Sequence, residues 1–223
     1  MDFRHEWKHE INLADMLDLR QRLRAVMKPD EHAKGGKYFI RSLYFDNAQD
    51  KALREKLDGV NSREKFRIRF YNMDDSLIHL EKKSKRGGLG NKASTELTRD
   101  ETLRIIAGDI GWMQEDERDL LRELYEKMRS EGLRPKTIVD YTREPFVFSA
   151  GNVRVTLDYN IRTGLGRTDI FSEKCVTVPV AGNPAILEVK WDAFLPSIIR
   201  DIVQLDGRRT SAFSKYAACR QYD

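Results

Sequence analysis

The chain has 223 residues, of which 40% are hydrophobic and 34% are charged, which is typical of a globular protein with a sizeable core. Its net charge of +4 is too small to indicate a partner, because the positions of the charges decide what a surface binds. The sequence has no long apolar run and no apolar leader, which excludes a membrane span and a signal peptide. Its two cysteines, Cys175 and Cys219, are far apart, which excludes a disulfide scaffold. We therefore expect a cytoplasmic location.

Alternating apolar and polar residues predict about eight β-strands. They cover residues 2–10, 38–46, 63–72, 76–85, 91–98, 136–146, 152–162 and 184–192. Helical periodicity predicts a helix over 13–26 after the N-cap Asn12, and further helices over 47–58, 99–107, 115–130, 196–204 and 211–220. This irregular order with short links indicates an antiparallel α+β fold. Because no linker or repeat divides the sequence, we expect a single domain, residues 1–223.

Charged residues gather on one face of the predicted strands, because side chains two positions apart point the same way. In the strand 63–72 the cations Arg63, Lys65, Arg67 and Arg69 alternate with a mainly apolar set, namely Glu64, Phe66, Ile68 and Phe70. Four other predicted strands also have a charged face. These faces carry Glu6, Lys8 and Glu10 in strand 2–10; His79, Glu81, Lys83 and Lys85 in strand 76–85; Arg154 and Asp158 in strand 152–162; and Glu188, Lys190 and Asp192 in strand 184–192. An open sheet with a solvated face explains any single strand. The repeated long cations favour a β-barrel with its charged side inward and its helices outside.

A lining of arginines and lysines indicates a polyanionic ligand, because so many like charges repel one another. Arginine offers a planar fork to phosphate oxygens, and interspersed carboxylates can hold a divalent cation that bridges to phosphate. The combination favours a metal–triphosphate complex. Duplex nucleic acid fits less well, since it requires an exposed basic stripe with few acidic residues, so no nucleic-acid partner is expected.

Nine short segments, in this order along the chain, carry a resemblance to a known family. They are Arg4-His5-Glu6-Trp7-Lys8, Ser42-Leu43-Tyr44-Phe45-Asp46, Lys65-Phe66-Arg67-Ile68-Arg69-Phe70-Tyr71, Leu80-Glu81-Lys82-Lys83, Asn91-Lys92, Tyr141-Thr142-Arg143, Val153-Arg154-Val155-Thr156-Leu157-Asp158, Leu187-Glu188-Val189-Lys190 and Phe213-Ser214-Lys215-Tyr216. With these segments the chain resembles the VTC domain, the polyphosphate polymerase domain of the vacuolar transporter chaperone family. That family is a branch of the triphosphate tunnel metalloenzymes in the CYTH-like superfamily.

The resemblance implies an antiparallel tunnel that makes inorganic polyphosphate from ATP or another triphosphate. The implied catalytic cations are Lys8, Arg67, Arg69 and Lys215. The implied substrate-binding residues are Lys83, Lys92, Tyr141, Arg143, Arg154 and Ser214. Glu188 is implied as the ligand of a divalent metal ion, Mn²⁺ or Mg²⁺. Arg67 and Arg69 are expected to face water inside the tunnel. Eukaryotic members of the family carry membrane-spanning parts, and this sequence shows none. If the polymer is exported, we therefore expect a separate membrane protein as partner.

The residues leave several alternatives open. Glu188 could instead be a counter-ion of Lys190 or of a lining arginine, whereas Glu6 and Glu81 are expected to orient lining lysines. Hydrolases of the superfamily commonly pair two glutamates as Glu-x-Glu, and here Lys190 stands in the second position after Glu188. This lysine favours holding phosphate over activating water. A triphosphatase of the same fold and a non-catalytic polyphosphate-binding module are the alternatives to a polymerase.

Overall fold

The computed structural model describes residues 5–87, 89–205 and 212–221. The chain divides into two compact units. Unit 1 comprises Met1–Phe39, Tyr141–Ile161 and Pro179–Ser214, and unit 2 comprises Ile40–Asp140, Arg162–Val178 and Lys215–Asp223. Within the described residues, no helix is long and apolar enough to cross a membrane. The expected single domain over 1–223 stays a prediction.

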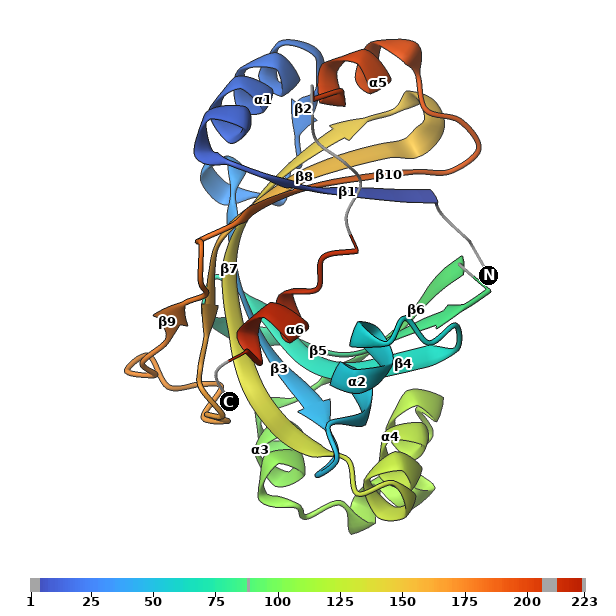
Figure 1. Ribbon diagram of the computed structural model, residues 1–223. Coiled ribbons are helices and arrows are strands. Elements are labelled where there is room, and N and C mark those ends of the chain that lie inside the picture. Colours follow the sequence, from blue (N-terminus) through green and yellow to red (C-terminus); the bar gives the residue numbers. More distant parts are fainter. Residues whose placement is uncertain (1–4, 88, 206–211, 222–223) are drawn as a thin grey trace. The chain divides into compact units, whose positions relative to one another are not determined.

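Unit 1 contains antiparallel strands with two helices packed against one face. The strand order is β1 (His5–Ile11), β10 (Ala185–Trp191), β8 (Val153–Thr163) and the second part of β7 (Arg134–Phe148), with β2 (Lys28–Pro29) on β7 and β9 (Val178–Pro179) on β8. The helices α1 (Leu13–Val26) and α5 (Ser197–Val203) lie side by side (Figure 1). Leu19 and Leu23 of α1 share a buried cluster with Val155, Leu187 and Ile199. This core covers the apolar face of the strands and leaves their charged face on the other side.

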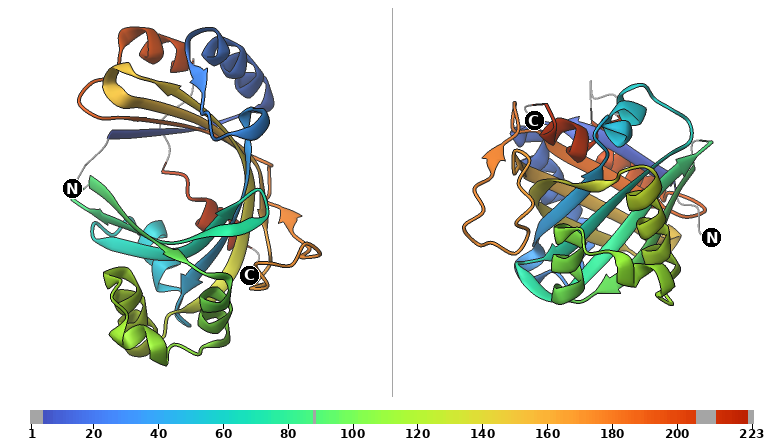
Figure 2. Two further views of the ribbon diagram at one scale, coloured as in Figure 1. Left: turned by 180° about the vertical axis from the view of Figure 1, so that it is seen from behind. Right: turned by 90° about the horizontal axis from the view of Figure 1, so that it is seen from below.

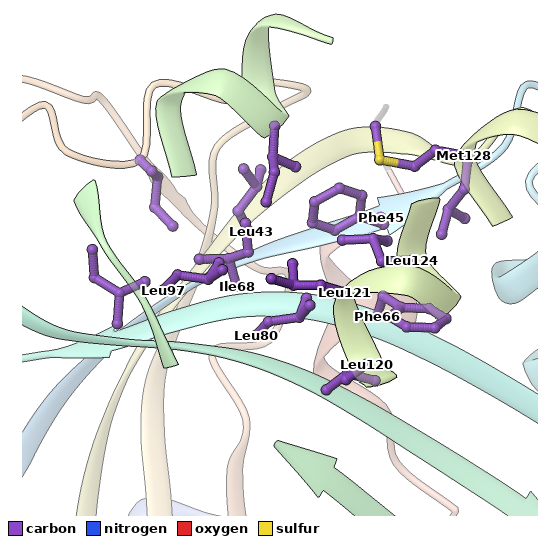
Figure 3. Packing of buried hydrophobic residues seen from close by; sticks show 14 of the residues in the cluster. Leu43, Phe45, Phe66, Ile68, Leu80, Leu97, Leu120, Leu121, Leu124 and Met128 are labelled. Atoms are coloured by element: carbon purple, nitrogen blue, oxygen red, sulfur yellow. The ribbon is translucent and has the colours of Figure 1, made fainter. Parts of the chain in front are cut away.

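The described residues of unit 2 contain the remaining strands and four α-helices. The strand order is the first part of β7, β3 (Tyr38–Asp46), β4 (Arg63–Tyr71), β5 (Asp74–Arg86) and β6 (Leu89–Leu97). The helices are α2 (Lys51–Leu57), α3 (Arg99–Ala107), α4 (Asp119–Ser130) and α6 (Lys215–Cys219). Figure 2 shows α3 and α4 on the same side of the strands β4 to β6. Figure 3 shows Leu43, Phe66 and Leu80 of three neighbouring strands packed with Leu121 and Leu124 of α4.

The antiparallel α+β fold is confirmed, and the predicted elements agree closely with the observed ones. The strand 38–46 and the helices 13–26 and 99–107 have the predicted bounds, and Asn12 forms a capping box with Asp15. The sequence does not predict β2 and β9, because two residues are too few for an alternating pattern. Residues 2–4 of the first predicted strand and residue 211 of the last predicted helix lie outside the described residues. Closure of the strands into a barrel stays a prediction.

Two predicted helices begin later than expected because aspartate and asparagine side chains hold the preceding residues in turns. The helix predicted over 47–58 begins at Lys51, and Asp46 and Asn47 accept backbone N–H groups ahead of and within its first turn. The helix predicted over 115–130 begins at Asp119, and Asp116 accepts both the backbone N–H and the guanidinium of Arg118. Such side-chain contacts compete with the start of a helix.

Candidate functional site

The buried carboxylate of Glu81, which is 2% exposed, lies at the centre of a group of cations on the charged face of unit 2. Arg67 Nη2 lies 2.6 Å from Glu81 Oε2, Lys92 Nζ lies 2.8 Å from Oε1, and Arg69 Nη1 lies 3.7 Å from Oε2. We call these four residues the Glu81 cluster. Burial raises the pKa of Glu81, but the attraction of the three cations is stronger and holds that pKa well below its ordinary value. Glu81 is therefore ionised and orients its neighbours, as expected.

The two arginines of the Glu81 cluster are each held by a second partner on β3. The antiparallel register pairs Arg67 with Tyr44 and Arg69 with Ser42, so these side chains share one face. Arg67 Nη1 donates to the Tyr44 hydroxyl at 2.9 Å, and Arg69 Nε donates to Ser42 Oγ at 2.9 Å. The expectation that Arg69 faces water is wrong, because its side chain is only 4% exposed among these partners. Arg67 is partly buried, and its Nε and Nη2 edge lies on Glu81.

Three lysines form a row across the same face of unit 2. Lys65 of β4 lies opposite Lys83 of β5, and Lys83 lies opposite Lys92 of β6. Like charges directly opposite one another weaken an antiparallel pair. An anion bound across the row would offset this repulsion. The structure therefore brings together four of the predicted site residues of unit 2, namely Arg67, Arg69, Lys83 and Lys92.

The charged face of unit 1 has a second buried carboxylate, Glu188 of β10. Lys190 Nζ lies 2.7 Å from Glu188 Oε1, and Lys8 Nζ lies 3.3 Å from Oε2. Glu6 lies 2.9 Å from Lys8 and 3.6 Å from Lys190. We call these four residues the Glu188 cluster. Burial lowers the pKa of Lys8, but Glu188 and Glu6 raise it more, so Lys8 stays protonated. In this structure Glu188 is thus a counter-ion of two lysines.

Two further predicted cations of unit 1 are held by aspartates. Arg143 forms a bidentate pair with Asp158, with Nε at 2.7 Å from Oδ1 and Nη2 at 2.8 Å from Oδ2. Arg154 Nη2 lies 2.8 Å from Asp30 Oδ2. The Arg143 guanidinium also lies over the ring of Tyr141, with its Cζ 5.6 Å from the ring centroid. Each guanidinium is fixed in position by a carboxylate before any ligand is present.

The helix α6 begins at Lys215, directly after Ser214, as expected. The next residue, Tyr216, anchors this helix to unit 2. Its ring stacks on that of Tyr44 with 5.0 Å between centroids, and its hydroxyl donates to Asp46 Oδ2 at 2.6 Å. Lys215 therefore starts a helix that is fixed to the charged face of unit 2 through Tyr44.

Sequence reasoning did not assign a role to Tyr44, Ser42, Asp30 or Asp158. The sequence does contain an indication for Tyr44 and Ser42, because both lie in the segment 42–46 that resembles the family. Asp158 ends another of these segments and shares the charged face of β8 with Arg154. Asp30 follows β2 in a short connection, and no local pattern indicates that it pairs with Arg154.

The oxygen ligands available to a metal ion are few. Among the described residues, no group of three or more His, Cys, Asp and Glu side chains could hold a metal ion. Glu188 and Glu6 lie on neighbouring strands and contact the same two lysines. Mg²⁺ and similar hard ions are commonly bound by one or two carboxylates together with substrate phosphates. The donor set of the Glu188 cluster fits an ion of this kind when phosphate oxygens complete its coordination.

The fold belongs to a known structural class. The chain is similar to a protein from Bacillus halodurans that carries the name of a proposed adenylate cyclase, with 12% identity, a TM-score of 0.53, and coverage of 85% of this chain and 80% of that chain. It is also similar to a protein from Pyrococcus horikoshii OT3, with 11% identity, a TM-score of 0.50, and coverage of 96% and 97%. At these identities the likeness shows the fold alone. A search of curated proteins finds no match.

The family is shown by its sequence model. The model of the VTC domain matches residues 3–222 of the chain, which thus belongs to the VTC domain family. This confirms the family that the nine segments indicate.

Proposed function

We propose that the protein is a metal-dependent phosphotransferase that moves the γ-phosphate of ATP onto a polyphosphate chain. The observation that carries the proposal is the Glu81 cluster, in which three cations surround one buried carboxylate. The row of lysines beside it adds further positive charge. A face with such an excess attracts polyanions and suits phosphate oxygens. Membership of the VTC domain family supports a triphosphate as the ligand.

The chemistry requires alignment and neutralisation of charge rather than a strong base. The bond between the γ-phosphorus and the β–γ bridging oxygen breaks, a bond to the terminal oxygen of the acceptor chain forms, and ADP leaves. That acceptor oxygen is already anionic, so no proton has to be removed from it. We assign transfer to Lys8, Arg67, Arg69 and Lys215, and phosphate binding to Lys83, Lys92, Tyr141, Arg143, Arg154 and Ser214.

The carboxylate partners support this assignment, because they hold cations in fixed positions before the substrate arrives. Arg67 rests on Glu81, and Arg143 rests on Asp158 through two hydrogen bonds. Preorganised donors stabilise the charge of a transition state without reorganising at the moment of reaction. Glu188 is the proposed ligand of a divalent ion, Mn²⁺ or Mg²⁺, which would neutralise phosphate charge when bound.

Water as the acceptor is the second candidate, and the Glu188 cluster disfavours it. Both carboxylates of the cluster form ion pairs with Lys8 and Lys190, so their oxygens are directed at these ammonium groups rather than at a water molecule. The two reactions are distinguished by measuring ADP release from ATP with and without short-chain polyphosphate. A polymerase releases ADP faster when the acceptor is added. An unchanged rate would indicate a triphosphatase, and no ADP at all would indicate a binding module.

Binding of a phosphate chain is expected to stabilise the protein. A ligand at about 100 times its Kd adds about 2.7 kcal/mol, which raises Tm by roughly 5–10 °C for a chain of this size. We expect this rise with tripolyphosphate and a clearly smaller one with orthophosphate, measured by thermal unfolding at matched ionic strength. Equal shifts for both anions would indicate general screening and would contradict a dedicated site.

Replacing Arg67 by lysine is expected to weaken tripolyphosphate binding by roughly 10- to 100-fold. Lysine keeps the charge but cannot contact Glu81, Tyr44 and a phosphate together, because it lacks the planar fork. Calorimetric titration measures the affinity. The matched control is Arg20→Lys, since Arg20 forms a bidentate pair with Glu144 outside both clusters. Equal losses in the two variants would contradict a specific role for Arg67.

A further inference from the structure

Tyr44 occupies a central position on the charged face of unit 2, yet it is outside the residues to which the family resemblance assigns a role. It lies opposite Arg67 in the register of β3 and β4 and is 3% exposed. Its hydroxyl accepts a hydrogen bond from Arg67 Nη1 at 2.9 Å. Its ring stacks on that of Tyr216, which fixes the orientation of the side chain. The hydroxyl is therefore held rigidly beside a proposed catalytic cation.

The proton of this hydroxyl indicates what the group binds. A tyrosine hydroxyl can accept hydrogen bonds and donates one. The Tyr44 oxygen accepts a hydrogen bond from Arg67. Among the described residues, no group accepts the proton of the Tyr44 hydroxyl. A buried hydroxyl without an acceptor costs free energy, so a partner is expected in the functional state. Because Lys65 Nζ and Arg67 Cζ each lie 5.7 Å from the ring centroid, that partner is expected to be an anion.

We propose that the Tyr44 hydroxyl is a ligand of the bound phosphate chain and donates its proton to an anionic phosphate oxygen, while Arg67 holds it from the other side. This inference rests on the proposed function, which supplies the phosphate chain. It adds a neutral hydrogen-bond donor to a set of charged groups. Such a donor requires an anionic oxygen at a defined position, so it contributes to alignment as well as to affinity.

The charges around Tyr44 make the affinity for a phosphate chain depend on pH. Charged and titratable groups near Tyr44 come from β3, β4, β5 and the C-terminal segment: Asp46 of β3, Lys65, Arg67 and Arg69 of β4, Glu81 of β5, Tyr216 of α6, and Arg220 directly after α6. Burial raises the pKa of Tyr44, but Arg67, Lys65 and Arg69 lower it more, to about 8. Above that pH the free protein loses the proton and gains a negative charge beside the phosphate site. A bound phosphate favours the protonated form.

Affinity for a phosphate chain is therefore expected to fall as the pH rises above about 8, by up to about tenfold per pH unit, because binding then requires uptake of a proton. The test measures the Kd for tripolyphosphate without metal at about pH 7 and about pH 9. The variants are Tyr44→Phe, which keeps the ring stack, and the control Tyr125→Phe, whose hydroxyl bonds Gln114 on the helical side of unit 2. We expect Tyr44→Phe to bind about tenfold more weakly at pH 7 and to lose the pH dependence.

An unchanged affinity and pH profile in Tyr44→Phe would overturn the inference and leave the proposed function intact. Failure of the wild-type protein to bind tripolyphosphate would overturn the proposed function itself. A second readout uses the wild-type protein alone, so it does not depend on how a variant folds. Its ultraviolet absorbance should report a tyrosinate forming near pH 8, and saturating tripolyphosphate should suppress that signal. A signal that the ligand does not alter would also overturn the inference.

Discussion

Glu81→Gln is expected to destabilise the ligand-free protein by about 3 kcal/mol, which is the order of effect for removing one partner of a buried ion pair. The variant keeps the shape of the side chain but leaves Arg67, Arg69 and Lys92 without their shared carboxylate. The three cations then repel one another in a partly buried setting. Urea unfolding at neutral pH, without ligand, measures the free energy of unfolding.

The same variant is expected to respond more strongly to a phosphate chain than the wild-type protein. The Glu81→Gln variant lacks the negative charge of the carboxylate, and bound tripolyphosphate supplies negative charge close to the same cations. The ligand should therefore restore much of the lost stability. The control is Glu123→Gln, since Glu123 pairs with Lys82 on the opposite face of β5 and is partly exposed. It should cost less than about 1 kcal/mol and leave the effect of the ligand unchanged. Equal gains from tripolyphosphate in wild type and Glu81→Gln would contradict the account.

The contribution of ionised Glu81 also has a defined dependence on pH. Its pKa in the folded protein lies below the ordinary value. The stabilisation is therefore fully present above the pKa of the unfolded chain and is lost as the pH falls through the lower folded value. The difference in stability between wild type and Glu81→Gln should persist from neutral pH to mildly acidic pH and shrink only in strong acid.

Glu188→Gln is expected to abolish most metal-dependent turnover while leaving phosphate binding intact. The amide keeps the shape but is a poor ligand for Mn²⁺ or Mg²⁺ compared with a carboxylate. It also leaves Lys8 and Lys190 with less compensating charge, so tripolyphosphate should bind as well or better without metal. Turnover against metal concentration and metal-free affinity are measured on the same preparation.

Glu6→Gln is the matched control for this experiment. Glu6 contacts the same two lysines but is more exposed than Glu188. Removing its charge should raise metal-free affinity in the same direction and leave most of the turnover. If Glu188→Gln keeps its activity with an unchanged requirement for metal, Glu188 is only a counter-ion. Equal losses of turnover in both variants would assign the metal to the pair of carboxylates rather than to Glu188.

The sequence predicts which face of each strand is charged, because alternation along a strand is a local property. Arg67 and Lys83 lie on the expected face for this reason. The partners of these cations depend on the register between strands and on connections distant in sequence, so they could not be predicted. Asp30 and Arg154 are 124 positions apart, and Arg69 is buried and donates to Ser42, which the register of β3 and β4 places opposite it. Alternation gives the direction of a side chain but not its depth.

The pairing of cations with carboxylates also changes one expectation about the empty site. A lining of bare cations would repel itself and require an anion to hold together. The described residues instead place Glu81, Glu188 and Asp158 among the cations. These carboxylates explain how the charged faces exist without a ligand, and the remaining excess of cations is the basis for binding one.

The central claim, transfer of phosphate from ATP to a growing chain, is tested most directly with ATP labelled at the γ-phosphorus. The purified protein is incubated with labelled ATP, Mn²⁺ and short-chain polyphosphate, and the products are resolved on a gel. The account predicts label in chains longer than the added acceptor, and loss of this product in Arg67→Lys. Label that reaches only orthophosphate would make water the acceptor and contradict the claim.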